Sequence, residues 1–195
     1  MLMTNRMSKL VLTSHVTFSV GWLGAVAVFL ALAITGLHSQ NEQLVRACLL
    51  AMKTSAWFVI LPFCLTALAT GIIQAAWTKW GLFRYYWIVV KLFLTLGSTI
   101  LLLLHLQPIN ELANAASQPA FSNSEHVPKT IDLIAKSGAA ILVLLFITTI
   151  SIYKPWGKIE IKGGLSKPVV IAAVISIALL VFVLIHLFGG GMHGH

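Results

Sequence analysis

Three polar residues of one long apolar stretch, Lys91, Ser98 and His105, are spaced by seven. Because an α-helix turns by about 100° per residue, steps of seven bring side chains back to within about 20° of one another. Ionisable groups in apolar helices usually face a bundle interior. The stripe therefore predicts a polar lining, in which Lys91 is either a counter-charge for an anionic ligand, for example a haem propionate, or a lysine that snorkels to the near surface.

Histidines lie near the ends of several apolar stretches. His105 comes three residues before Pro108, and His186 comes three residues before a run of glycines. We expect these two imidazoles at one depth, where neutral rings from different helices can supply both axial nitrogens of haem b. His15 is expected at the depth of Lys91, where the two mark a second, inner candidate site. The alternative for each histidine is an interfacial position with no ligand.

Several residues that we expect on the outer side of the membrane have side chains that suit copper. Imidazole binds copper, and a thioether binds Cu(I). The candidate copper ligands are His38, His105, His186, Met192 and His193. The sequence has no nucleophile–base pair, no glycine-rich phosphate loop and no CxxC motif, so hydrolytic and nucleotide-driven chemistry find no residues here, and enzymatic activity is left open.

The residues above must be positioned by five apolar stretches, most of them about 20 residues long, which is the length of a membrane-spanning α-helix. The chain is 58% hydrophobic and 9% charged, against about 25% charged residues in soluble domains. Continuous runs without period-two alternation favour helices over a barrel. We therefore expect an all-α, polytopic membrane helix bundle that forms a single domain, 1–195, with five transmembrane helices at 12–37, 54–77, 86–107, 133–153 and 169–188.

Basic residues predict the orientation of this bundle. Most of them fall at the N-terminus and in alternate loops: Arg6, Lys9, Lys79, Arg84, Lys154, Lys158, Lys162 and Lys167. By the positive-inside rule the N-terminus is inside and the C-terminus outside, with the loops 38–53 and 108–130 outside as well. The formal charge of +8 then follows from topology and anionic lipid, so we expect the lipid bilayer and no nucleic acid as a partner.

Several residues carry predictions about packing. Gly21 and Gly24 favour close approach of another helix to the first span. Pro62 predicts a kink in the second span, with a freed backbone carbonyl. Asp132 and Lys136, four residues apart at the start of the fourth span, predict a self-neutralising ion pair.

Parts of the sequence resemble known membrane families. The string His15-x6-Trp22-Leu23-Gly24 resembles the opening of the copper-resistance protein D family and of the HemJ-type protoporphyrinogen oxidase family. The string from Tyr86 to Leu92, with the apolar run that follows it to His105, resembles their third helix. The strings 80–92, 153–157 and 186–191 are similar to a group of bacterial integral membrane proteins without an assigned function.

These resemblances carry implications for the site residues. The HemJ-type likeness implies that His15 is a haem ligand and that Lys91 is an essential lysine. The likeness to the copper-resistance family implies that the outer histidines and Met192 form a copper entry site.

Together these patterns predict a haem-b-binding protein of the bacterial inner membrane that serves electron transfer or haem-linked redox chemistry. Its expected partners are a quinone or a redox protein. One alternative is a copper transport or handling protein. The other is an accessory membrane subunit without a cofactor, which associates through the small residues of the first span, including as a homo-oligomer.

Overall fold

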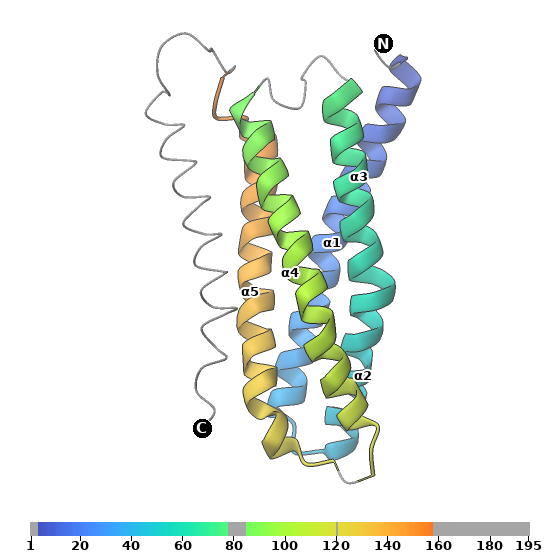
Figure 1. The fold of residues 1–195 in the computed structure, drawn as a ribbon, viewed down its shortest axis with the longest axis vertical. Coiled ribbons are helices and arrows are strands. Elements are labelled where there is room, and N and C mark those ends of the chain that lie inside the picture. Colours follow the sequence, from blue (N-terminus) through green and yellow to red (C-terminus); the bar gives the residue numbers. More distant parts are fainter. Residues whose placement is uncertain (1–3, 78–84, 120, 158–195) are drawn as a thin grey trace.

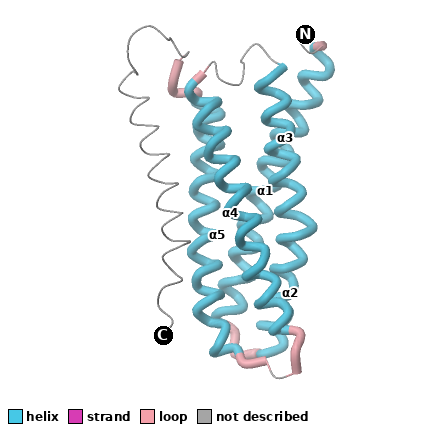
Figure 2. Tube along the Cα trace, viewed as in Figure 1, coloured by secondary structure: helices cyan, strands magenta, loops and turns pink. Residues whose placement is uncertain are grey.

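The computed structural model describes residues 4–77, 85–119 and 121–157, without the side chains of 123–125. These residues form helices joined by short loops (Figure 2). In chain order they are α1 (Asn5–His38), α2 (Glu42–Ser55), the π-helix η1 (Ala56–Ile60), α3 (Leu61–Trp77), α4 (Tyr86–Ala116) and α5 (Asn123–Tyr153).

The helices form an antiparallel four-rod bundle. The segments α2, η1 and α3 follow one another without a break, so they make one long rod. Both α1 and α4 pack against α3 and against α5, which gives a ring in the order α1, α3, α4, α5. Neighbours in this ring run in opposite directions (Figure 1). This is the up-down-up-down arrangement of a four-helix bundle, a scaffold that places cofactor sites between facing helices.

Four described segments are long and apolar enough to cross a bilayer: Asn5–His38, Glu42–Trp77, Tyr86–Ala116 and His126–Tyr153. Large apolar side chains point away from the bundle, and Phe58, Leu142 and Ile152 are 69–77% exposed. Such a surface suits lipid rather than water. The predicted all-α fold is confirmed for the described residues, and four of the five predicted spans coincide with helices that could cross a membrane. The fifth predicted span, 169–188, lies outside the described residues. The orientation across the membrane stays a prediction.

Two predicted loops are wrong, because helices occupy most of them. The predicted loop 38–53 holds α2, which starts after Asn41, whose Oδ1 accepts hydrogen bonds from the backbone N–H groups of Gln43 and Leu44. The predicted loop 108–130 holds the end of α4, which continues through Pro108, and the start of α5. Only residues 117–122 connect these two helices.

These additional helical turns are amphipathic rather than apolar. A prediction from long apolar runs therefore assigned them to loops. Their apolar side chains pack together at the end of the bundle where α1 joins α2, and we call this region the polar end. The buried residues that pack together there include Val45, Leu49, Met52, Ile109, Leu112 and Ala116. Burial of this stripe, rather than continuous hydrophobicity, stabilises the helices here.

Hydrogen bonds from α2 and η1 to the end of α4 hold the polar end together. Arg46 Nη1 donates to the backbone carbonyls of Ala116 at 2.6 Å and Gln118 at 2.5 Å, and Nη2 donates to that of Pro119 at 3.2 Å. Trp57 Nε1 donates to Asn110 Oδ1 at 2.9 Å. Arg46 therefore satisfies carbonyls at the C-terminus of α4, where a helix leaves them unpaired and favours positive charge.

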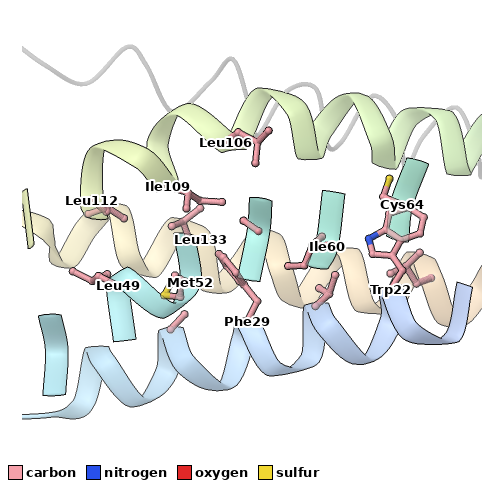
Figure 3. Packing of buried hydrophobic residues seen from close by; sticks show 14 of the residues in the cluster. Trp22, Phe29, Leu49, Met52, Ile60, Cys64, Leu106, Ile109, Leu112 and Leu133 are labelled. Atoms are coloured by element: carbon pink, nitrogen blue, oxygen red, sulfur yellow. The ribbon is translucent and has the colours of Figure 1, made fainter. Parts of the chain in front are cut away.

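A continuous apolar core runs along the bundle (Figure 3). Phe29 of α1 lies between the levels of Met52 and Ile60, and Trp22 lies near Cys64 (Figure 3). At the level of Cys64, its Sγ and the Oγ1 of Thr99 in α4 are 3.2 Å apart, so a hydrogen bond joins the α3 and α4 sides of the core. Packing in this core therefore determines which faces of α1, α4 and α5 point into the bundle interior.

The π-helical turn η1 interrupts the rod beside this core. The N–H of Leu61 donates to the carbonyl of Ala56, a bond that spans five residues instead of four. Pro62 follows directly and has no N–H to donate. The predicted kink at Pro62 stays a prediction; the structure places a wide turn directly before the proline. Wide turns of this kind are frequent at functional sites.

The two glycines of the first span differ in their surroundings. A Cβ on Gly21 would lie 2.6 Å from the ring of Phe63 in α3, so this glycine permits close approach as predicted. A Cβ on Gly24 would meet nothing within 4 Å in the described part of the chain. Gly24 therefore makes no close helix contact within the described residues, and its role in packing stays a prediction.

We expect Gly21→Leu to lower the free energy of unfolding in detergent micelles by about 1–3 kcal/mol, because the new side chain overpacks the contact with Phe63. That ring also packs edge-on against Phe18, with ring centroids 5.4 Å apart. Gly24→Leu is the matched control and should change stability by about 0.5 kcal/mol or less. Denaturant titration followed by circular dichroism measures both. Equal stabilities of the two variants would contradict the assignment of Gly21 as a contact.

Candidate functional site

A cavity of about 340 Å³ lies inside the bundle, between α1, η1, α4 and α5. Its wall is mostly apolar. The polar residues in the lining are Ser98 and His105 from α4 and Lys136 and Ser137 from α5. An apolar pocket of a few hundred cubic ångströms with a few convergent polar groups is the usual form of a cofactor site.

His105 has a defined hydrogen-bonding state. Its Nδ1 lies 2.6 Å from the backbone carbonyl oxygen of Leu101. Because a carbonyl only accepts, Nδ1 donates its proton, and in a neutral ring Nε2 then carries a lone pair. Nε2 is buried, and no described residue hydrogen-bonds to it. This is the tautomer in which histidine ligates a metal, with the other ring nitrogen held by a carbonyl.

The predicted stripe of α4 is only partly brought together. Ser98 and His105 both line the cavity, whereas Lys91 is not part of its lining. The expectation that His105 lies near the end of its helix is wrong, since α4 continues to Ala116. The chain turns polar directly after Leu106, so His105 still lies at the boundary of the apolar segment.

Lys136 brings a charge to the cavity wall. Its ammonium lies 2.5 Å from Asp132 Oδ2, which confirms the predicted ion pair. Both groups are close enough to act electrostatically on His105. The position of Lys136 in the cavity wall was not predicted. The signal was its spacing, because Leu133, Lys136, Ala140 and Val143 follow one another at helical intervals of three and four and all line the cavity.

His15 is held at the other end of the bundle, between α1 and α3. Its Nδ1 lies 3.0 Å from the carbonyl oxygen of Ala67 and 3.2 Å from Thr70 Oγ1. Gly71 gives the ring room, since a Cβ there would lie 3.0 Å from the Cε1 atom of His15. Lys91 is near enough to act electrostatically on His15. The role of the two residues as an inner site stays a prediction.

Lys91 is partly buried and lies against an aromatic ring. Its ammonium is 5.7 Å from the ring centroid of Trp87, and the ammonium of Lys154 is 5.9 Å from the same centroid. A cation over an indole face is favourable at a membrane boundary. Trp87 therefore lies at a cluster of positive charge at the end of the bundle opposite the polar end.

The five candidate copper ligands divide between described and undescribed parts of the chain. His38 ends α1, is exposed, and has its Nδ1 3.0 Å from the carbonyl oxygen of Ile34. His186, Met192 and His193 lie outside the described residues. Within the described ranges, no group of three or more His, Cys, Asp or Glu side chains converges on a metal-sized site. The copper set stays a prediction.

Known proteins give no indication of the function of this chain, so a functional proposal depends on its own residues. The likenesses to the copper-resistance and HemJ-type families stay predictions. No protein-family model matches the chain, and neither the curated proteins nor the solved structures give a match.

Proposed function

We propose that the protein binds haem b inside its helix bundle and serves electron transfer or haem-linked redox chemistry in the membrane. The observation that carries the proposal is the Nε2 atom of His105, a buried lone pair without a described hydrogen-bond partner. An unpaired buried polar atom is costly and calls for an explanation. Coordination of a haem iron is one that fits a histidine in the wall of an apolar cavity.

The residues present fit such a cofactor. The carbonyl of Leu101 holds the ring of His105 and makes its Nε2 a better ligand. Side chains such as Trp22 and Phe29 supply an apolar wall that excludes water. A bound haem supplies one-electron redox chemistry, and the protein supplies ligation and a low dielectric. His186, in the predicted span 169–188 outside the described residues, would be the second histidine that holds the haem.

A second haem position is part of the proposal. His15 and Lys91 lie within electrostatic reach of each other, at the end of the bundle opposite the polar end. With the N-terminus inside, histidines that held haem at both depths would let the protein carry electrons across a bacterial plasma membrane, to or from a quinone or a redox protein. His15 is the proposed ligand there, and Lys91 the proposed counter-charge.

The test is the optical spectrum of the full-length protein purified in detergent, before and after titration of the apo-protein with haemin. We expect a Soret band and, on reduction, an α-band near the b-type position. A colourless protein that carries copper and takes up no haemin would favour the copper alternative. A colourless, metal-free protein that takes up no haemin would favour the accessory subunit and overturn the proposal.

A further inference from the structure

We infer that Lys136 is the anchor for an acidic group of the ligand, a haem propionate, and that its ammonium leaves Asp132 for that group on binding. This inference rests on the proposed haem site, and it names the residue that recognises the polar edge of the ligand. The position comes from α5, the neighbour of the helix that carries His105.

The position of Lys136 connects the cavity with the surface. Among the described residues that line the cavity, Lys136 is the one with a formal charge. Its side chain is 22% exposed and that of Asp132 is 41% exposed. The apolar stem can therefore cover cavity wall while the ammonium stays at the edge. A porphyrin has the complementary shape, with an apolar macrocycle and carboxylates along one edge that must keep water or find a cation.

The exchange of partners requires little rearrangement. The pair of Asp132 and Lys136 is a partly exposed contact within one helix, a type that contributes little to stability. Asp132 remains hydrated when its partner leaves, because it is the more exposed of the two. The lysine stem is long and flexible, so the ammonium can reach a new acceptor without movement of the helix.

Lys91 is the counter-charge proposed for a ligand near His15, and its position shows that it cannot serve the ligand of His105 as well. It lies over the ring of Trp87 and does not line this cavity. Lys136 is therefore the cation that can neutralise a ligand held by His105.

The experiment titrates the apo-protein in micelles with haemin and with haemin dimethyl ester, whose propionates carry no charge. We expect Lys136→Gln to weaken haemin binding about tenfold and to leave binding of the ester unchanged, because only haemin loses a charge-assisted hydrogen bond. Lys129→Gln is the matched control. It breaks a similar lysine–carboxylate bridge, to Glu111 at 3.0 Å, away from the cavity lining, and should change neither titration.

The reverse change gives an independent readout. Asp132→Asn removes the competing carboxylate and should tighten haemin binding a few-fold. Equal losses for haemin and ester in Lys136→Gln, or no loss for haemin, would overturn the anchor while the haem site stands. If Lys136→Gln does not fold, unchanged haemin affinity in Asp132→Asn overturns it instead. A wild-type protein that binds neither porphyrin overturns the proposed function and the anchor with it.

Discussion

His105→Ala abolishes the low-spin b-type spectrum and weakens haem binding by about 100-fold or more. Loss of a supporting group around a metal ligand already lowers affinity about 10–100-fold, and this substitution removes the ligand itself. The Nε2 lone pair that no described residue satisfies is the atom that is lost. Optical titration of the apo-protein with haemin measures the change, and His186→Ala should have the same effect if His186 is the second histidine that holds the haem.

His38→Ala is the matched control for this experiment. Its Nδ1 also bonds the carbonyl four residues earlier, but the side chain is exposed at the end of α1 and does not line the cavity. We expect the spectrum and the haemin affinity of His38→Ala to equal those of the wild type. A Soret band of unchanged position and intensity in His105→Ala would defeat the ligand assignment, and parallel loss in His38→Ala would point to a general structural defect.

Arg46→Ala lowers the free energy of unfolding by about 2–3 kcal/mol. Hydrogen bonds that involve a charged group contribute about 1.5–3 kcal/mol each, and here partial exposure and the shared guanidinium reduce the sum. The substitution leaves the carbonyls of Ala116, Gln118 and Pro119 without this donor and removes the cation that lies 4.9 Å from the ring centroid of Phe121. Denaturant titration in micelles, followed by circular dichroism, measures the loss.

Two further variants separate the charge of Arg46 from its shape. Arg46→Lys keeps the charge but not the planar fork, so it should recover only part of the stability. Lys53→Ala removes a single exposed bond, 3.2 Å from Nζ to Asn114 Oδ1, and should change stability by about 0.5 kcal/mol or less. A wild-type stability for Arg46→Ala would show that the hydrogen bonds of Arg46 do not stabilise the contact between α2 and α4.

The sequence predicted the apolar spans well because hydrocarbon requires long uninterrupted runs. It failed where helices leave the apolar region. In α2, Val45, Leu49 and Met52 occupy one buried face while Glu42 and Arg46 pair on another, so average hydrophobicity is low although the helix is stable. Tertiary contacts with α4, which a hydropathy pattern does not contain, decide this segment.

The site was predictable to the extent that a single helix defines it. Seven-residue spacing placed Ser98 and His105 on one face, and four-residue spacing predicted the pair of Asp132 and Lys136. The sequence did not show that Lys136 lines the same cavity as Ser98 and His105, because that depends on which helices are neighbours in the ring. The tautomer of His105 depends on a backbone carbonyl, which no side-chain pattern records.

The π turn at Ala56–Ile60 has a consequence for the length of this chain. A wide turn holds one residue more than the regular turn that it replaces. A homologue in which this rod is a regular α-helix must therefore be one residue shorter between Met52 and Leu61, or its two halves would face different neighbours by about 100°. In an alignment, relatives with a one-residue gap at this point would have a regular helix here. Relatives without the gap would keep the wide turn, with residues equivalent to Ala56 and Ile60 in the cavity wall.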